Sequence, residues 1–285
     1  MTRSTWQHLR VPFSLYLFPV FPFALSQARS VNGPRAALLF VILHLLVYPA
    51  SNGFNSYYDR DQDSIGGLER PPLVTADLLW VSLALDAAAL LLALFVGWRL
   101  AAMLALFGLA SKAYSHPAIR LKARPWLGWM TVAFFQGAFT YFMISVGVAQ
   151  KPGDVDLRAA AAPALISSLL FGGAYPLTQV YQHAEDARRG DRTLSRLLGV
   201  PGTFLFSGLV FALSMVLLFL YFEWLGRRQH FYLVLGFALP VAATWAIWFW
   251  QVLRGDQPTF RGAMNLNRVS ATALGCCFTV LTLLR

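Results

Sequence analysis

The stretch Thr203–Leu225, TFLFSGLVFALSMVLLFLYFEWL, decides the fold class, because Glu223 is its single charged residue. About 20 mainly apolar residues suffice for an α-helix to cross the hydrocarbon of a bilayer. Across the 285 residues, 57% are hydrophobic and only 13% are charged, which leaves too few polar groups to coat a water-soluble globule. The stretch therefore predicts a transmembrane helix in a chain made largely of such helices.

Eight further apolar runs of similar character bring the predicted number of spans to nine. The fourth is short, and the first contains Pro12, Pro19 and Pro22, which predict kinks. The polar connections are too short for a separate soluble domain, so we expect one all-α transmembrane domain over residues 1–285. A secretory signal is the alternative interpretation of the first run. The predicted spans are Val11–Ala28, Ala36–Tyr57, Ala76–Trp98, Leu100–Tyr114, Trp126–Gln150, Ala160–Tyr181, Thr203–Leu225, Phe231–Leu253 and Ala263–Leu284.

The positive charges predict an orientation in the membrane. With the N-terminus in the cytoplasm, 15 of the 23 Lys and Arg residues fall on the cytoplasmic side, as the positive-inside rule requires. An odd number of spans then places the C-terminus on the other side. We expect a bacterial inner membrane protein whose net charge of +10 suits anionic lipid and an anionic substrate, with no role for nucleic acid.

Two short segments, both on the predicted cytoplasmic side, hold seven of the 13 carboxylates. In the first, Asn55, Asp59 and Asp63 recur every four residues, which would place them on one helical face about 6 Å apart. In the second, Gln182 and Asp186 repeat this spacing where the sixth span ends. The spacing predicts two rows of oxygen ligands, although solvated loop charges are the simpler alternative. The seven carboxylates are Asp59, Asp61, Asp63, Glu69, Glu185, Asp186 and Asp191.

Clustered carboxylates at helix C-terminal ends are unfavourable without a nearby cation. Mg²⁺ suits these residues, because it prefers oxygen ligands and commonly bridges one or two carboxylates to substrate phosphates. A diphosphate held against Mg²⁺ would be stabilised as it leaves. We therefore expect a magnesium site whose ligands come from both rows, with Asp59, Asp63 and Asp186 as the catalytic carboxylates.

The connection after the fourth span supplies cations for the same site. It contains Tyr114, Arg120 and Lys122, which are candidates to bind a diphosphate. Arg70 and Arg192, which lie in the two acidic segments, are further candidates. Ordinary positive-inside topology is the alternative explanation for these charges.

At these residues the chain resembles the UbiA superfamily of intramembrane prenyltransferases, over essentially its whole length. The family has nine transmembrane helices, an NxxxDxxxD motif after span two and a DxxxDxxxGxxT motif after span six. The first motif is complete in Asn55-Ser-Tyr-Tyr-Asp59-Arg-Asp-Gln-Asp63. The second is Gln182-His-Ala-Glu-Asp186-Ala-Arg-Arg-Gly190-Asp-Arg-Thr193, which matches at Asp186, Gly190 and Thr193.

The resemblance implies a helical bundle around a central cavity that polar loops cap, and ionisation of a polyprenyl diphosphate assisted by Mg²⁺. It implies Asn55, Asp59, Asp63 and Asp186 as metal ligands, with Gln182 in place of the first Asp of the second motif. Tyr114 resembles a loop tyrosine of the family, and Arg120 or Lys122 would replace its phosphate-binding lysine. Asp191 and Asn265 are expected near the mouth of the cavity.

Three functions agree with this pattern. The leading prediction is transfer of a prenyl group to a small lipophilic acceptor within the membrane lipid. A terpene cyclase of the same family would ionise the same diphosphate and close a ring. A non-catalytic binding protein or a transporter is the third, although the odd number of spans and the position of the acids at one surface oppose transport.

Overall fold

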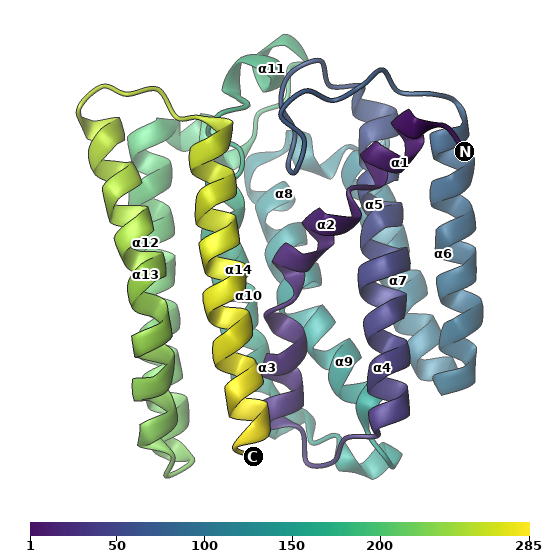
Figure 1. Ribbon diagram of the computed structural model, residues 1–285, viewed down its shortest axis with the longest axis vertical. Helices are drawn as coiled ribbons and strands as arrows, with labels where there is room; N and C mark the ends of the chain where they lie inside the picture. The colour runs from purple at the N-terminus through teal and green to yellow at the C-terminus, as the bar shows by residue number, and fades with distance from the viewer.

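The computed structural model describes residues 1–285, the side chain of Pro152 excepted, and forms a bundle of roughly parallel helical rods (Figure 1). Eight helical segments among the described residues are long and apolar enough to cross a membrane. The helix α7, Trp98–Ser115, is the predicted short span and stands beside them. The two chain termini lie at opposite ends of the bundle, as an odd number of crossings requires (Figure 1). The all-α transmembrane fold predicted from the sequence is confirmed.

The prolines and a left-handed residue break the first span into short pieces. Its pieces are α1 (Arg3–Leu9), α2 (Val11–Ser14), η1 (Leu15–Leu17) and α3 (Val20–Gln27). Arg10 has φ of 49° and ends α1, while Pro12 lies in the first turn of α2 and Pro19 caps α3. Ser14, Pro19 and Val20 of this stretch are buried in the bundle, whereas Pro12 and Leu15 are exposed, so neighbouring helices shield only part of the irregular backbone.

The remaining rods follow the predicted spans closely. Two of them contain one π-helical stretch each, η2 in the second span and η4 in the fifth. The bounds are α4 (Gly33–Val41), η2 (Ile42–Val47), α5 (Tyr48–Asp59), α6 (Asp77–Val96), α8 (Pro125–Val132), η4 (Ala133–Phe139), α9 (Thr140–Val148), α10 (Leu157–Leu177), α12 (Leu194–Trp224), α13 (Arg228–Leu253) and α14 (Phe260–Leu283). Three short helices lie in the connections, η3 (Leu121–Ala123), η5 (Pro152–Asp154) and α11 (His183–Arg188).

Close packing explains how the π-helical stretch η4 is tolerated. The backbone at Gly137 approaches α10 so closely that an added Cβ would lie 2.4 Å from Ser168 Cα. The Ser168 hydroxyl accepts a hydrogen bond from the Ala138 amide at 3.0 Å. Small residues allow such close approach between membrane helices, and the serine satisfies a backbone group that the irregular turn frees.

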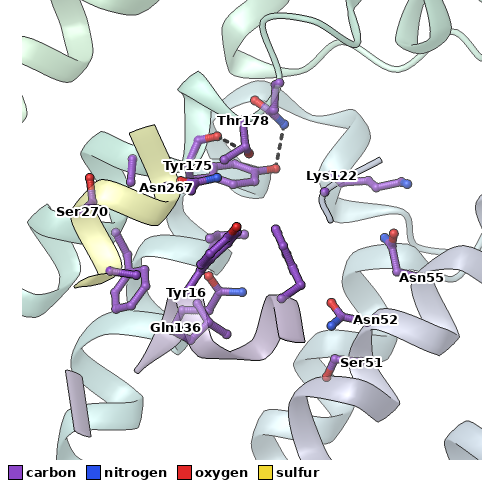
Figure 2. A pocket seen from close by; sticks show the side chains of 18 of the residues that line it. Tyr16, Ser51, Asn52, Asn55, Lys122, Gln136, Tyr175, Thr178, Asn267 and Ser270 are labelled. Carbon is purple, nitrogen blue, oxygen red and sulfur yellow. Dashed lines mark hydrogen bonds between the residues drawn. The ribbon is translucent and has the colours of Figure 1, made fainter. Parts of the chain in front are cut away.

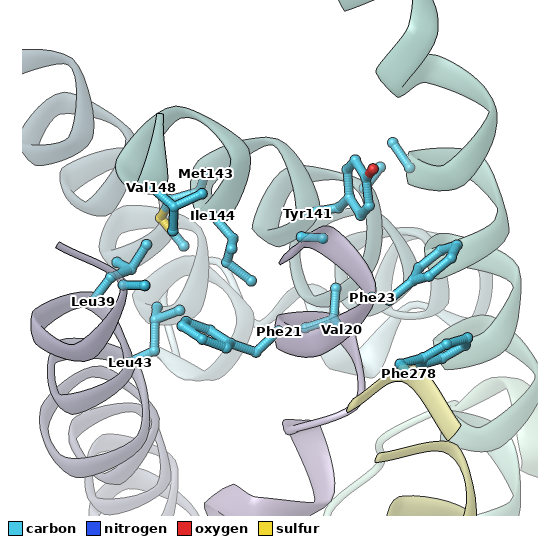
Figure 3. Close-up of a cluster of buried hydrophobic side chains, with 14 of the residues drawn as sticks. Val20, Phe21, Phe23, Leu39, Leu43, Tyr141, Met143, Ile144, Val148 and Phe278 are labelled. Atoms are coloured by element: carbon cyan, nitrogen blue, oxygen red, sulfur yellow. The ribbon is translucent and has the colours of Figure 1, made fainter. Parts of the chain in front are cut away.

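The main apolar core lies between α3, α4, α9 and α14 (Figure 3). Phe23 stacks on Phe278 with ring centroids 4.5 Å apart, and both side chains are almost fully buried. Leu39, Leu43 and Ile144 fill the neighbouring space. Lipid chains are as apolar as these residues, so the core is stabilised by close van der Waals contact more than by exclusion of water.

Candidate active site

A cavity of about 660 Å³ lies among α5, α7, α10 and α14. The connections 60–76 and 178–193, together with Asp59 and Lys122, form its polar end, which we call the mouth. The other walls are mainly apolar, with Phe107, Phe135, Met215 and Leu274 among them. Figure 2 shows polar side chains from several helices pointing into this space. The arrangement suits an amphiphile with a charged head at the mouth and an apolar body inside the bundle.

The end of α5 determines which acids of the first segment reach the mouth. The helix stops at Asp59, because Arg60 adopts a left-handed conformation with φ of 49° and its amide donates to the Ser56 carbonyl. The chain then turns, so that Asp61 lines the cavity. Asp63 instead pairs with Arg188, with 59% of its side chain exposed. The prediction that Asn55, Asp59 and Asp63 share one helical face is therefore wrong at Asp63.

Asp59 is the centre of the charges at the mouth. Only 3% of its side chain is exposed, and it forms an ion pair with Lys122. Arg120 Nη1 lies 3.4 Å and Arg189 Nη1 lies 3.7 Å from Asp59 Oδ1. A buried carboxylate is tolerated only when cations and hydrogen bonds compensate for the lost hydration. Asp59 thus joins α5 to the connection after α7 and to the segment around α11.

The second acidic segment does not extend α10, which ends at Leu177. Gln182 precedes the separate helix α11 and donates its side-chain amide to the Ser64 carbonyl at 3.0 Å. Asp186 accepts a hydrogen bond from the Thr193 hydroxyl at 3.2 Å. Asp191 accepts two bonds from the Arg120 guanidinium, at 2.7 and 2.8 Å. The segment is therefore fixed to both neighbouring connections.

Two acids at the mouth are short of positive charge. Burial, followed by the proximity of Asp59, raises the pKa of Asp61 to about 6, although Arg189 lies 2.8 Å away. Burial is also the main cause that raises the pKa of Asp186 to about 6. Among the described lining residues, carboxylates outnumber cations by five to three. The carboxylates are Asp59, Asp61, Glu185, Asp186 and Asp191, and the cations are Arg10, Lys122 and Arg189.

The donor set fits Mg²⁺. Carboxylate and amide oxygens of Asn55, Asp59, Asp61, Gln182 and Asp186 line one cavity, and the two acids with raised pKa values call for another cation. No three His, Cys, Asp or Glu side chains of the described residues converge on one point. That spread agrees with an ion that keeps several waters and takes only one or two carboxylates together with substrate phosphates.

A family comparison identifies the protein class. The model of the UbiA prenyltransferase family matches residues 16–270, which is most of the chain. The chain belongs to the UbiA prenyltransferase family. A curated UbiA-type relative, digeranylgeranylglyceryl phosphate synthase of Natronomonas pharaonis, is 31% identical over 125 residues. This match covers 42% of the chain and spans less than half, 44%, of the relative.

Solved UbiA structures share the fold over nearly their full length. A UbiA homologue from Archaeoglobus fulgidus, bound to GPP and Mg²⁺, has a TM-score of 0.68 at 17% identity, with coverage of 97% of this chain and 99% of the other. A homologue from Aeropyrum pernix K1 in its apo form has the same TM-score and identity, with coverage of 98% and 99%. At this identity the similarity establishes the UbiA fold alone.

The structure brings most of the sequence-predicted UbiA site residues to one cavity. Arg120 lies directly behind the wall, bonded to Asp59 and Asp191. Four candidates lie away from the lining: Asp63, Arg70, Arg192 and Asn265 are all exposed. The candidates that do line it are Asn55, Asp59, Tyr114, Lys122, Gln182, Asp186 and Asp191.

The sequence interpretation missed some residues at the mouth. The sequence leaves open whether Asp61 is a ligand or a solvated loop charge, and it assigns no role to Arg189. Arg189 donates to Glu185 at 2.9 Å, four residues earlier on the same face of α11. The four-residue spacing between Glu185 and Arg189 is the sequence signal that could have identified Arg189.

Proposed function

We propose that this UbiA-family protein is a Mg²⁺-dependent prenyltransferase that ionises a polyprenyl diphosphate and transfers the prenyl group to a small lipophilic acceptor. The observation that carries the proposal is the single cavity in which an oxygen-rich, partly cationic mouth opens onto apolar walls. These two surfaces match the two halves of a prenyl diphosphate. The site belongs to one domain that extends over residues 1–285.

The mouth would hold the diphosphate and the metal. Asn55, Asp59, Asp61 and Asp186 would supply the oxygen ligands, with Gln182 offering an amide oxygen. When bound, Mg²⁺ neutralises charge that develops on the departing diphosphate. Lys122 and Arg189, which now pair with Asp59 and Asp61, would exchange part of that pairing for phosphate oxygens.

The reaction begins with cleavage of the bond between the prenyl C1 atom and the diphosphate oxygen, which keeps the electron pair. A nucleophilic atom of the acceptor then forms a bond to C1 and loses its proton. Phe107, Phe135 and Phe211 line the cavity and offer aromatic faces, which attract a cation and exclude water. Tyr114, which hydrogen-bonds to Tyr175, would lie beside the diphosphate.

The membrane location follows from the same proposal. We place the N-terminus and the mouth on the cytoplasmic side of a bacterial inner membrane, because 15 of the 23 Lys and Arg residues then face the cytoplasm. A soluble, charged diphosphate would reach the mouth from water, whereas the acceptor would arrive through lipid. Labelling of a cysteine introduced at exposed Arg70 in sealed vesicles of known orientation tests this side.

The decisive experiment incubates purified protein with geranyl, farnesyl or geranylgeranyl diphosphate, Mg²⁺ and a lipid extract. Diphosphate release and a new prenylated lipid, both abolished by EDTA, are the expected results. Release with a cyclic hydrocarbon as the product would instead indicate a terpene cyclase. Absence of Mg²⁺-dependent diphosphate binding by calorimetry would refute the proposal and favour a non-catalytic role.

A further inference from the structure

A second cavity, of about 460 Å³, lies at the end of the bundle opposite the mouth, where the C-terminus is also found (Figure 1). Its walls come from the ends of α3, α9 and α12, from the start of α10 and from Arg285. We call it the distal pocket. None of the described residues that line it also lines the active-site cavity, and the reaction proposed at the mouth gives it no role.

The distal pocket lies at the depth of the lipid head groups. It is formed where membrane-spanning helices begin or end, since α9 ends at Val148, α10 begins at Leu157 and α12 ends at Trp224. Trp224 lines the pocket and is 73% exposed. Tryptophan is enriched at the boundary between the hydrocarbon of a bilayer and water. The head groups of the surrounding lipid therefore lie level with the opening of the pocket.

Three arginines line the rim of the distal pocket, and two of them lack an acidic partner. Arg29 pairs with Asp156 at 2.7 Å. Arg227 and Arg285 are exposed, and neither forms an ion pair with a carboxylate of the described residues. The proposed orientation places this end away from the cytoplasm, where the positive-inside rule disfavours arginine. Two unpaired arginines at this rim call for an anionic partner.

The two acids of the distal pocket are already compensated within the chain. Asp156, besides its pair with Arg29, accepts hydrogen bonds from two backbone amides at the start of α10. Asp154 accepts hydrogen bonds from the Ser30 hydroxyl and from the Lys151 amide. A carboxylate bonded in this way attracts no further cation strongly. The free charge that an incoming group would meet is therefore positive.

The floor of the distal pocket is uncharged and rich in hydroxyl and amide groups. Tyr221 donates to Gln27 Oε1 at 2.9 Å, and Gln27 donates to Ser26 Oγ at 2.7 Å. Tyr141 and Ser145 line the same space. Tyr141, Ser26 and Tyr221 are at most 8% exposed, so their polar groups lie beneath the rim. Groups that both donate and accept hydrogen bonds suit a ligand that carries hydroxyls.

We infer that the distal pocket binds the head group of an anionic membrane phospholipid with head-group hydroxyls, of the phosphatidylglycerol class. Arg227 and Arg285 would contact the phosphodiester, and Gln27 and Tyr221 would hydrogen-bond to the hydroxyls. The acyl chains would extend past Trp224 into the membrane. A zwitterionic lipid would instead bring a cationic group toward the arginines, which disfavours it. Binding here would be independent of the reaction proposed at the mouth.

The test measures lipid binding to the delipidated protein by native mass spectrometry. Three lipids with identical acyl chains are compared: phosphatidylglycerol, phosphatidylpropanol, which keeps the charge without the hydroxyls, and zwitterionic phosphatidylcholine. We expect phosphatidylglycerol to bind at least about fivefold more tightly than phosphatidylpropanol and about tenfold more tightly than phosphatidylcholine. Soluble glycerophosphoglycerol distinguishes a membrane lipid from a free phosphate ester, and it should bind at least about 100-fold more weakly because it lacks acyl chains.

Arg227→Gln and Arg285→Gln should each weaken phosphatidylglycerol binding about tenfold, because each removes a charged hydrogen-bond donor. Arg99→Gln is the matched control, since it removes the same charge from an exposed position at the same end of the bundle, outside the pocket lining. It should change the affinity by less than about twofold, because charges exposed to water are screened. Thermal unfolding in detergent checks that each variant is folded.

Tyr221→Phe tests the floor separately from the rim. It should remove most of the preference for phosphatidylglycerol over phosphatidylpropanol and leave the affinity for phosphatidylpropanol within about twofold of the wild type. Equal losses in Arg227→Gln, Arg285→Gln and Arg99→Gln would show general attraction of anionic lipid and overturn the inference. Unchanged binding in both rim variants, equal affinity for phosphatidylglycerol and phosphatidylpropanol, or equally tight binding of the soluble head group would also overturn it.

Discussion

Among the described residues, the mouth has buried ion pairs that the opposite end of the bundle lacks. At the mouth, Asp59 and Asp191 are almost fully buried and pair with cations from other segments. At the opposite end, the side chains of Arg228 and Glu223 are 58% and 41% exposed, and these residues are near neighbours in sequence. Exposed pairs contribute little because water screens them. Removal of one partner from a buried pair leaves an uncompensated charge and is strongly destabilising, although the intact pair adds little net stability. The buried charges at the mouth are therefore better explained by a functional requirement than by stability.

The largest effect is expected at the centre of the mouth. Asp59→Asn should lower the rate of diphosphate release by about 10³-fold or more, since it removes a metal ligand and the partner of Lys122. Steady-state release of diphosphate measures it, with thermal unfolding in detergent as a check of the fold. Glu223→Gln at the opposite end is the matched control and should remain within about twofold of the wild type.

A comparison of Asp61 with Asp63 tests the geometry of the first acidic segment. Asp61→Asn should lower turnover about 10²-fold, because Asp61 lines the cavity. Asp63→Asn should cost less than about tenfold, because that side chain pairs with Arg188 at the surface. Steady-state turnover of the two variants, measured under the same conditions, tests this order of effects. The reverse order of effects would mean that substrate and metal draw Asp63 into the mouth.

Lys122 should act mainly on the binding of the diphosphate. Lys122→Met is expected to raise the KM for the prenyl diphosphate about tenfold, and the KM for the acceptor should stay close to the wild-type value. Arg70→Met, an exposed cation outside the cavity lining, is the control. An equal effect of both substitutions would indicate general electrostatic attraction and no direct contact.

A smaller effect is expected at Gln182. A carboxylate cannot donate to the Ser64 carbonyl, so Gln182→Asp would lose that hydrogen bond while adding a possible metal ligand. We expect turnover within about fivefold of the wild type and a lower Mg²⁺ concentration for half-maximal activity. A Mg²⁺ titration of turnover in Gln182→Asp and Gln182→Asn separates the charge from the hydrogen bond. If Mg²⁺ dependence is the same in both variants, Gln182 is not near the metal.

The partly buried pair between Asp86 and Lys112 lies away from the mouth and should affect stability alone. It joins α6 to α7. Asp86→Asn should lower the thermal midpoint by a few degrees, because Lys112 would lose its partner inside the bundle. The exchange Asp86→Lys with Lys112→Asp should restore part of that loss. Turnover at low temperature should change less than about twofold in both proteins.

The transmembrane helices could be predicted from the sequence, whereas the arrangement of side chains at the mouth could be predicted only in part. The two outcomes have different physical reasons. The composition of long apolar runs such as Thr203–Leu225 is enough to predict spans, and the observed helix α12 contains that run up to Trp224, with Leu225 as its C-cap. The position of Asp63 depends on the left-handed conformation of Arg60, which no apolar or charge pattern indicates. The partners of Asp59 come from connections more than 60 residues away, so only the folded chain shows which cation compensates which acid.

The bulge in the fifth span also limits how this chain tolerates change in length. Deletion of one residue within Ala133–Phe139 would restore regular helical hydrogen bonding, yet it would remove the wide turn that places Gly137 against α10. Gly137 would then leave its contact with α10, and Ser168 would lose its donor. A shorter, more regular helix would therefore pack less well against α10. We expect single-residue deletions to destabilise the protein here and to be tolerated in the exposed 254–259 connection.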